Sequence, residues 1–581
     1  MYDSRTYTPA TVRLVEVRLL DGPNVYRLAP AVKVEVAIGR RRTWYGQRVP
    51  ERYAVVRLGA RARRADQPPP IRRLADWVRR LHVLALDERR VDVGVHRASD
   101  PGHWIVQFPW HAAGRAEALA NAAYRLLERG EDPRTYRPPR QLLARIRSAE
   151  TTPPAWVTDE QRHVPLISVS GTNGKSTTTR MIAHILQRAG RRVAMTTTDG
   201  VYVDGSLVEE GDLTGPQGAR TALEQPAIDV GVFETARGGI LLRGLGYESN
   251  DAAVLTNISA DHLDLQGLHT LPELAEVKSV IAQVTRPDGT VVLNADDRWV
   301  AGLARRMRAR VVLFSMRAAP PSSRTGLHLA RGGWAVLHDD GWLVEARGAR
   351  RRRIVRAVDV PTTLGGLARH NIANALAAAA GARAMGATLE QVADGLREFR
   401  PTSEQLPGRS NIYRLGNRLV LVDYAHNEAG MAALFELLEA LVGRKGHRRA
   451  SVSLIMGTAG DRPDDTLRAM GRLAGQRADE VSIKVIRRFL RGRTRDSLVG
   501  GFLAGLREGG IKPADVRVYD TETEALATEL ADPARLAGQV GGPPRVMFVM
   551  AQDDREGVQR LLLERGARQV DDVAELADLR A

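Results

Sequence analysis

One seven-residue segment constrains the fold of this chain more than any other. Residues Gly171–Thr177 read Gly-Thr-Asn-Gly-Lys-Ser-Thr, between a predicted strand at Pro165–Ser170 and a predicted helix at Ser176–Arg188. A glycine-rich turn in this context lets backbone N–H groups point at phosphate oxygens, and the helix N-terminus adds partial positive charge. The segment therefore predicts a phosphate-binding loop in an α/β fold. We expect Lys175 to reach the outer phosphates and Ser176 to ligate Mg²⁺.

The residues around this loop predict three domains. From Val164 onward, short apolar strands alternate with helices, which is typical of a parallel sheet covered by helices. Before it, strand-like runs mix with two helical stretches. Residues Val311–Val360 read as hairpins, and a second α/β rhythm starts near Leu419. We expect a small α+β domain at 1–150, a central phosphate-loop ATPase domain with a β insertion at 151–405, and a Rossmann-like C-terminal domain at 406–581.

Composition excludes several classes of protein. The chain of 581 residues is 43% hydrophobic and 26% charged, as in soluble globular proteins, and its lack of cysteine excludes disulfides and thiolate metal sites. It has neither an apolar run of membrane-spanning length nor a signal-peptide pattern at its start, so we expect no membrane segment and a cytoplasmic location. The net charge of +17 is spread along the chain, and aromatic residues are only 5%. An arginine-rich composition explains the charge better than a nucleic-acid partner does.

Lysine is rare in this arginine-rich chain. Of 85 basic residues only six are lysines. An ammonium group is a compact point charge that can lose its proton and react, whereas a guanidinium does neither well. Lysines that persist in such a chain are therefore candidates for specific roles. They are Lys33, Lys175, Lys278, Lys445, Lys484 and Lys512.

The loop has two residues between its glycines instead of the usual four. In this short form it resembles the ATP loop of the Mur ligase and folylpolyglutamate synthetase superfamily. The resemblance implies an ATP site and makes the last two expected domains the central and C-terminal domains of a Mur ligase. The residues that it assigns to ATP from the loop are Gly171, Thr172, Asn173, Gly174, Lys175, Ser176 and Thr177.

Two Mg²⁺ positions are expected beside the loop. Glu234 ends a predicted strand, and a carboxylate there faces the crevice where α/β sheets bind ligands, so it can ligate Mg²⁺. The resemblance assigns His262 to a second Mg²⁺. It also implies that Lys278, on a predicted helix at Pro272–Gln283, is carbamylated, which would turn its ammonium into an oxygen ligand.

Further motifs follow in the order of the superfamily. Asn294 and Asn371 belong by resemblance to the nucleotide region, Asn371 in an adenine-contacting motif that opens a helix. Arg409 is expected to contact ATP phosphates after domain closure. Asp423 and His426 follow a predicted strand and would approach the γ-phosphate and the acyl phosphate.

Several strings also resemble the N-terminal and Mur-like parts of the cyanophycin synthetase family. They include Leu20–Tyr26, Thr196–Gly200, Gly211–Pro216 and Asp423–Gly430. There is no room between these parts for that family's ATP-grasp domain. Leu490–Arg493 is kept, but Ile486 and Arg487 stand where the family has an acidic pair. If that pair holds a guanidinium, arginine is not the preferred incoming amino acid here.

The function implied is that of an ATP-dependent ligase that activates a carboxylate as an acyl phosphate and joins it to an amine. We expect an acidic peptide or polymer as acceptor, an amino acid as donor, a homo-oligomeric protein and a separate ATP-grasp synthetase as a possible partner. Two alternatives stay open. One is a poly-γ-glutamate or peptidoglycan-type ligase, and the other is a non-catalytic relative that binds polymer or nucleotide.

Overall fold

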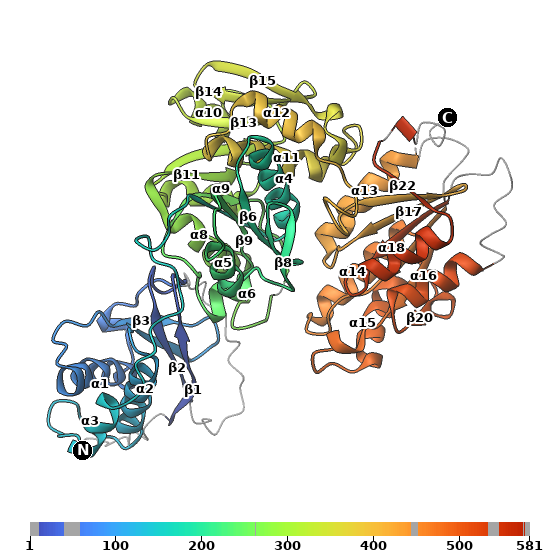
Figure 1. The fold of residues 1–581 in the computed structure, drawn as a ribbon. Coiled ribbons are helices and arrows are strands. Elements are labelled where there is room, and N and C mark those ends of the chain that lie inside the picture. Colours follow the sequence, from blue (N-terminus) through green and yellow to red (C-terminus); the bar gives the residue numbers. More distant parts are fainter. Residues whose placement is uncertain are drawn as a thin grey trace. The chain divides into compact units, whose positions relative to one another are not determined.

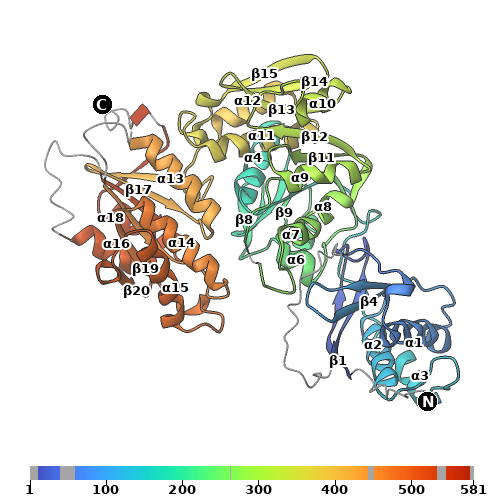
Figure 2. The same cartoon turned by 180° about the vertical axis from the view of Figure 1, so that it is seen from behind.

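The computed structural model describes residues 11–39, 59–261, 263–442, 451–532, 545–572 and 574–575. These residues form two compact units (Figures 1 and 2). The first unit comprises Met1–Ser170, Ala194–Ala253 and Gln266–Gly289, and the second comprises Gly171–Val193, Val254–Leu265 and Thr290–Ala581. Three sheets carry the fold, and the mixture of parallel strands and helices confirms the predicted α/β class.

The N-terminal part of the first unit is a four-stranded sheet with helices on one face (Figure 1). Its strand order is β1-β2-β4-β3, and β2 pairs antiparallel with β1 and β4. Alternate residues Val32, Val34 and Val36 are buried against the helices, which explains why the helices cover that face. The elements are β1 (Thr11–Leu20), β2 (Ala31–Gly39), α1 (Pro69–Leu86), β3 (Gly94–Arg97), β4 (His103–Pro109), α2 (Ala113–Glu128) and α3 (Arg140–Arg147).

An eleven-stranded sheet follows, in the order β15-β14-β13-β12-β11-β10-β5-β9-β6-β7-β8. β5 pairs parallel with β9, as expected for the strand before a phosphate loop. Its strands are β5 (Leu166–Ser170), β6 (Val193–Thr197), β7 (Gly200–Val203), β8 (Ser206–Glu210), β9 (Val230–Glu234), β10 (Asn250–Leu255), β11 (Thr285–Asn294), β12 (Arg310–Ser315), β13 (Trp334–Asp339), β14 (Trp342–Arg347) and β15 (Arg350–Arg356).

Helices connect these strands, and those of the second unit pack on one another. Gly395 of α12 lies against Ile185 of α4, where a Cβ would come within 2.8 Å of the isoleucine. The helices are α4 (Lys175–Arg188), α5 (Pro216–Leu223), α6 (Arg237–Leu242), α7 (Leu271–Lys278), α8 (Val280–Gln283), α9 (Arg298–Gly302), α10 (Arg324–Ala330), α11 (Arg369–Ala384) and α12 (Leu389–Glu398).

The expected hairpins at 311–360 are only partly correct. β13–β14 and β14–β15 are antiparallel pairs, but β12 pairs parallel with both β11 and β13. The glycines at 332 and 333 end helix α10 rather than forming a hairpin turn, so the chain crosses over before β13. The basic run Arg350–Arg353 lies in edge strand β15 with exposed side chains. An exposed edge rich in charge resists pairing with another chain.

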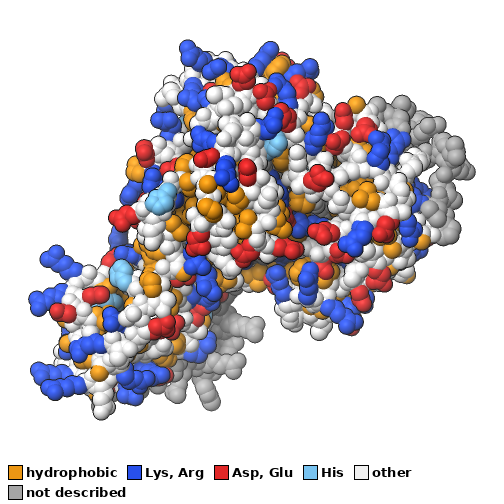
Figure 3. All heavy atoms as spheres, in the orientation of Figure 1, with side chains coloured by type: hydrophobic (Ala, Val, Ile, Leu, Met, Phe, Trp, Pro, Cys, Tyr) orange, Lys and Arg blue, Asp and Glu red, His pale blue; other side chains and the backbone are white. Residues whose placement is uncertain are grey.

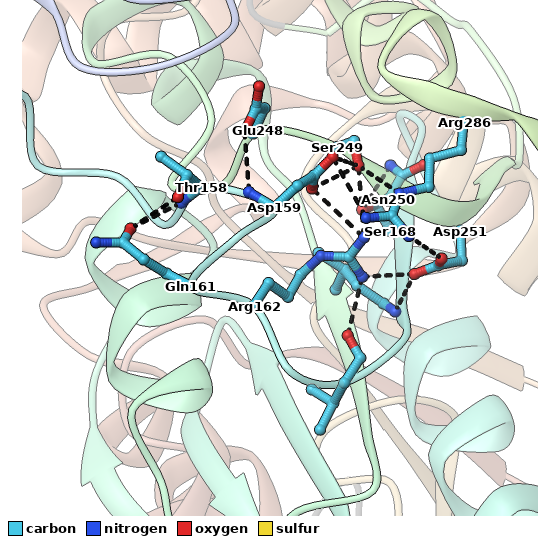
Figure 4. Close-up of polar contacts among 12 residues, drawn as sticks. Thr158, Asp159, Gln161, Arg162, Ser168, Glu248, Ser249, Asn250, Asp251 and Arg286 are labelled. Carbon is cyan, nitrogen blue, oxygen red and sulfur yellow. Dashed lines mark hydrogen bonds and ion pairs between the residues drawn. The ribbon is translucent and has the colours of Figure 1, made fainter.

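A buried polar network holds the amino end of β5 (Figure 4). The Arg162 side chain is 1% exposed, lies 2.5 Å from Asp251 Oδ2 and donates to the carbonyl of Val164. Asp251 also accepts from the backbone N–H of Leu166, the first residue of β5. Ser249 and Arg286 complete the network through a hydrogen bond of 3.1 Å. The segment that enters the sheet from the N-terminal domain is therefore fixed by charge-assisted hydrogen bonds.

The C-terminal part of the second unit is a seven-stranded sheet in the order β20-β19-β18-β21-β17-β16-β22. Alternate residues of β17 face two cores: Leu419 and Leu421 pack with α13, α14 and α15, and Val420 and Val422 pack with α16 and α18. The five strands from β20 to β17 are parallel. The elements are β16 (Asn411–Leu415), β17 (Arg418–Asp423), α13 (Glu428–Val442), β18 (Ser451–Met456), α14 (Asp464–Arg477), β19 (Glu480–Lys484), α15 (Arg495–Glu508), β20 (Arg517–Tyr519), α16 (Glu522–Ala531), β21 (Arg545–Met550), α18 (Arg555–Glu564) and β22 (Arg568–Val570).

Charge is distributed over the surface. On the face shown in Figure 3, lysine and arginine side chains are interspersed with acidic ones rather than gathered in one patch. Among the described helices, none combines the length and the apolar character needed to cross a membrane.

Candidate functional site

The phosphate loop needs glycine at both ends. Gly171 has φ +152° and Gly174 has φ +83°, a region that favours glycine. A Cβ on Gly171 would lie 1.9 Å from Thr256 Oγ1, and one on Gly174 would lie 2.2 Å from Asn374 Oδ1. Gly174 immediately precedes α4, so the loop delivers the N–H groups of the first helical turn to its concave side.

The segment after β10 fastens this loop. The N–H of Thr172 donates to the carbonyl of Asn257 (2.8 Å), and the N–H of Asn173 donates to Asn257 Oδ1 (2.9 Å). Thr256 Oγ1 and Asn257 Nδ2 both donate to the carbonyl of Asn173, at 2.7 and 3.0 Å. Lys175 Nζ donates to the carbonyl of Thr172 at 3.0 Å, so its ammonium is held over the loop.

Each of the two asparagines assigned to the nucleotide region is hydrogen-bonded to a residue that contacts the phosphate loop. Asn294 Nδ2 donates to the carbonyl of Thr256 at 2.7 Å. Asn371 is buried, donates to the carbonyl of Thr362 and accepts from Asn374 Nδ2 at 3.0 Å. Asn374, in turn, is the residue that crowds Gly174. Asn374 was not singled out from the sequence, although it lies in the same motif as Asn371.

Arg409 reaches the loop from the start of the C-terminal sheet. Its Nη2 donates to Ser176 Oγ at 3.3 Å, and its guanidinium lies 4.3 Å from the centroid of the Tyr424 ring. The face of the ring orients the cation. The structure thus places this arginine beside the predicted Mg²⁺ ligand Ser176.

Asp423 anchors the turn that follows β17. Its Oδ2 accepts from the N–H of Ser410 and its Oδ1 from the N–H of Ala425, both at 2.7 Å. Burial raises the pKa of the Asp423 carboxyl, although Arg409 and these donors oppose the shift. Ser410 Oγ also lies 3.3 Å from His370 Nε2. Asp423 therefore organises the turn that carries His426.

His426 belongs to a charged cluster that the sequence did not reveal. Its Nε2 lies 3.3 Å from Asp261 Oδ2, and Nδ1 lies 3.1 Å from the carbonyl of Tyr424. Asp261 Oδ1 forms a 2.9 Å ion pair with Arg462 Nη1, and the two side chains are only 9% and 3% exposed. His262, predicted to bind a second metal ion, lies outside the described residues. Its neighbour Asp261 and the distant Arg462 carry no local sequence signal that would assign them a role.

A reciprocal amide pair joins the loop to the last domain. Asn173 Nδ2 donates to Asn427 Oδ1 at 3.3 Å, and Asn427 Nδ2 donates to Asn173 Oδ1 at 3.1 Å. Asn427 is 1% exposed and also accepts from the N–H of Gly430, which lies in the first turn of α13. The side chain of Asn427 therefore couples the first turn of α13 to the phosphate loop.

Glu234 lies in the first unit, at the carboxyl end of β9 as predicted. It is in register with Val169 of β5, and its side chain is 1% exposed. With Thr196 and Thr235 it lines a cavity of about 10 Å³, which is room for one water molecule or ion. The Glu234 carboxylate supplies oxygen ligands of the kind that Mg²⁺ prefers.

Lys278 also lies in the first unit. It is the last residue of α7 and is 5% exposed. The predicted helix 272–283 is divided after it, because Ser279 separates α7 from α8. Burial of a lysine is costly unless it is paired or modified, so its position is consistent with a specific role.

The basic residues of the 487–493 segment are mostly neutralised within their own domain. Arg491 pairs with Asp461 at 2.5 Å, Arg493 pairs with Asp464 at 2.6 Å, and Arg488 pairs with Asp553. Arg487 is exposed, and no ion pair of its own is found among the described residues. Among Arg487, Arg488, Arg491 and Arg493, the charge of Arg487 is therefore the one that no ion pair of the described residues balances.

The second unit thus brings together most of the predicted residues. They are the loop 171–177, Asn294, Asn371, Arg409, Asp423 and His426. Glu234 and Lys278 belong to the first unit. Residues that sequence reasoning missed are Thr256, Asn257, Asn374, Asn427, Asp261 and Arg462, which are neutral or paired supports.

Comparison with known proteins shows what parts of this chain are similar to. Residues 169–382 match the model of the Mur ligase middle domain. A cyanophycin synthetase of Trichormus variabilis is 42% identical over 63% of this chain and 40% of the relative. A UDP-N-acetylmuramoyl-L-alanyl-D-glutamate–2,6-diaminopimelate ligase of Alkalilimnicola ehrlichii is 30% identical over 56% of this chain and 61% of the relative. A Mycobacterium tuberculosis folylpolyglutamate synthase structure is 21% identical over 69% of this chain and 90% of that chain, with a TM-score of 0.49. The chain spans less than half the length of the cyanophycin synthetases it matches.

Proposed function

Because the chain carries a Mur ligase middle domain and is homologous to cyanophycin synthetases over part of its length, we propose that it is an ATP-dependent ligase that joins a carboxylate to an amine. A phosphate loop in the strand-loop-helix context and a cluster of polar residues around it support the proposal. The alternative of a non-catalytic binding protein would not require both a lysine held over the loop and an arginine at Ser176.

The reaction has two steps. An oxygen of the acceptor carboxylate attacks the γ-phosphorus of ATP, the bond to the bridging oxygen breaks, and ADP leaves with that electron pair. The amine then attacks the carbonyl carbon of the acyl phosphate, loses a proton, and inorganic phosphate leaves. Both steps develop charge on phosphate oxygens, so positioned cations and N–H donors are the expected source of rate.

Residues of this chain fit those tasks. Lys175 would bind the outer phosphates, and the N–H groups of the loop would bind their oxygens. Arg409 would neutralise charge beside Ser176, and His426 would hold or move a proton near the leaving phosphate. Ser176 and Glu234 would hold one Mg²⁺ and His262 and Lys278 a second, and when bound these ions neutralise phosphate charge.

One observation carries the proposal above the others. The amide pair between Asn173 and Asn427 and the contact from Arg409 to Ser176 connect the phosphate loop to the residues just before β16 and just after β17. A ligase that must hold ATP against a second substrate needs such a connection, because the reacting atoms come from different domains. A nucleotide-binding module alone would not.

The acceptor and the donor can be proposed only as chemical classes. We propose an acidic peptide or polymer as acceptor and an amino acid as donor. The diaminopimelate ligase is named for an acceptor that ends in D-glutamate and for the amino acid 2,6-diaminopimelate, and the other relatives are named for cyanophycin. Arg487 stands exposed on the segment after β19, which favours a donor amino acid other than arginine. A glutamate-type or muramyl-type acceptor is the competing possibility within the same chemistry.

The test is ADP release over a panel of carboxylates and amino acids. Wild-type protein should release ADP only when an acceptor and an amine are both present, and the product should gain the mass of an amide. Lys175→Ala should abolish release with its thermal unfolding unchanged. Lys512→Ala is the matched control, because Lys512 is exposed in another part of the second unit. Turnover at the wild-type rate by Lys175→Ala would contradict the proposal that the loop binds ATP.

A further inference from the structure

A turn of the N-terminal domain grips the start of the helix that carries Lys278. Ser99 Oγ donates to Glu273 Oε1 at 2.5 Å, and His269 Nε2 lies 2.8 Å from Asp100 Oδ1. Ser99 and Asp100 lie between β3 and β4, about 170 residues before their partners (|i−j| 174 and 169). All of these residues lie within the first unit.

We call the contacts of Ser99 with Glu273 and of Asp100 with His269 the clasp, and Glu273 is its central residue. It is 4% exposed, and its Oε2 accepts from the N–H groups of His269 and Thr270 at 2.8 and 2.9 Å. Together with the Thr270 side chain it forms the capping box that begins α7. Oε1 of Glu273 thus accepts a hydrogen bond from the N-terminal domain, and Oε2 accepts from the backbone N–H groups at the start of α7.

The backbone beside the clasp is built for close approach. Gly267 has φ +72°, and a Cβ there would lie 3.3 Å from Asp100 Oδ2. A second set of contacts joins the segment after β1 to residues 243–245 of the same unit. The N–H of Asp21 donates to the carbonyl of Arg243 at 2.6 Å, and the N–H of Leu245 donates to the carbonyl of Pro23 at 2.8 Å. The N-terminal domain is therefore held at two places, and the clasp is not an isolated surface contact.

The position of Lys278 depends on this clasp because α7 is short. The helix has 8 residues, and Lys278 lies five residues after Glu273, which is about 7.5 Å of helical rise. Both side chains are buried. A helix of this length has little stability of its own, so its cap and its packing fix where its last residue lies.

We infer that Ser99 and Asp100 of the N-terminal domain are positioning residues for Lys278, acting through Glu273 and His269. The inference rests on the proposed metal role of Lys278. It gives the N-terminal domain a part in the reaction of the central domain: holding the lysine end of α7 where a metal-binding oxygen is needed. Residues that orient a metal ligand typically change metal affinity by roughly 10- to 100-fold when removed.

The test compares Ser99→Ala/Asp100→Asn with the control Ser148→Ala/Asp132→Asn, which changes two exposed residues of the same domain. The clasp variant should need roughly 10-fold more Mg²⁺ for half-maximal ADP release, at unchanged KM for ATP. After incubation with ¹³C-bicarbonate, its carbamate NMR signal should fall relative to wild type. Ser99→Thr keeps the hydroxyl and should restore both readouts. A merely structural role would lower thermal stability without separating Mg²⁺ dependence from KM for ATP.

Two outcomes separate the inference from the function on which it rests. If Lys278→Ala is fully active, the metal role of Lys278 is wrong and the clasp has no ligand to position. If Lys278→Ala is inactive but the clasp variant keeps the Mg²⁺ dependence and carbamate signal of wild type, the inference alone is overturned. Should the double variant fail to fold, Ser99→Ala alone removes the 2.5 Å hydrogen bond and answers the same question.

Discussion

The ion pair between Asp261 and Arg462 allows a quantitative test of the site. Arg462→Met removes the guanidinium and keeps much of the side-chain volume. Asp261 is 9% exposed and its partner 3%, so the carboxylate is left largely buried. Breaking a buried pair from one side costs about 3–5 kcal/mol. Because His426 remains 3.3 Å from Asp261, part of this cost is offset, and we expect about 2–3 kcal/mol.

The assay is a double-mutant cycle on the free energy of unfolding, measured by denaturant titration. A loss of about 2–3 kcal/mol corresponds to roughly 30- to 150-fold in the folding equilibrium constant. Asp261→Asn/Arg462→Met should recover part of that loss, since no charge is then left unpaired, and the coupling energy should exceed about 1.5 kcal/mol. ADP release by each variant shows separately whether turnover changes as well.

A surface pair of the same domain supplies the control. Arg477 lies 2.5 Å from Glu439, with side chains that are 37% and 27% exposed. Arg477→Met should therefore cost no more than about 1 kcal/mol. The reasoning is refuted if the Asp261 and Arg462 substitutions are additive to within about 0.5 kcal/mol, which is the behaviour of independent sites.

Three further predictions follow from single positions. Gly174→Ala should abolish ATP binding, measured by calorimetry. Gly190 has a similar φ of +84° but open space where a Cβ would lie, so Gly190→Ala should keep ATP binding and lower the free energy of unfolding by only about 1–2 kcal/mol through backbone strain. Equal loss of ATP binding in both variants would contradict the crowding argument. Burial lowers the pKa of His96 to about 4. The neutral ring therefore contributes stability that is fully present above pH 6.5 and is lost as the pH falls toward 4, about 3 kcal/mol in all. His96→Gln should make thermal stability nearly independent of pH over that range, and an unchanged pH slope would refute this. Arg487→Glu should raise activity with arginine as donor amino acid in the ADP-release assay, and an arginine optimum already present in wild type and unaffected by the change would show that Arg487 does not set specificity.

Local sequence was sufficient for the phosphate loop and for most elements near it. Local patterns predicted the strand before Gly171, the helix after Gly174 and the strand end at Glu234. The spacing of hydrophobic residues and the backbone freedom of glycine can both be read from a few neighbouring residues. Helix α7 was predicted too long, since nothing local marks the break at Ser279.

Pairings between distant segments were not predictable. The contacts of Asp261 with Arg462 and of Ser99 with Glu273 join residues far apart in the chain, and they depend on strand order and on how loops pack. The parallel pairing of β12 has the same origin: its hydrophobic run of four residues, Val311–Phe314, fits either a hairpin or a crossover. Site supports such as Asn427 look like ordinary polar residues until the fold brings a partner to them.

The rarity of lysine had a second explanation besides catalysis. Lys33 bridges Glu16 and Glu35 at 2.7 Å each, and Lys484 lies 2.9 Å from Glu522, with both side chains fully buried. A point-like ammonium on a slender stem fits such places, where a planar guanidinium needs more room. Persistent lysines in this chain therefore mark buried carboxylates as well as candidate catalytic positions.

Lys484 gives this idea a direct test. Its stem packs on Gly457, where a Cβ would lie 2.7 Å from the lysine Cγ, so there is little space for a larger head group. Burial opposes ionisation of Glu522, but the Lys484 ammonium and the N–H groups of Asp553 and Asp554 hold its pKa below the ordinary value. Lys484→Met leaves this carboxylate buried without its cation and should cost about 3–5 kcal/mol.

Lys484→Arg keeps the charge and should still cost about 1–3 kcal/mol through overpacking against Gly457. The measurement is the free energy of opening from hydrogen exchange of the β19 and β21 amides, with the exposed Lys512→Met as control, expected within about 0.5 kcal/mol of wild type. Asp553, whose N–H is bound by Glu522, is also the partner of Arg488. Loss of the buried pair should therefore loosen the 487–493 segment and weaken saturation by the donor amino acid. If Lys484→Arg is as stable as wild type, space does not explain the choice of lysine at this position.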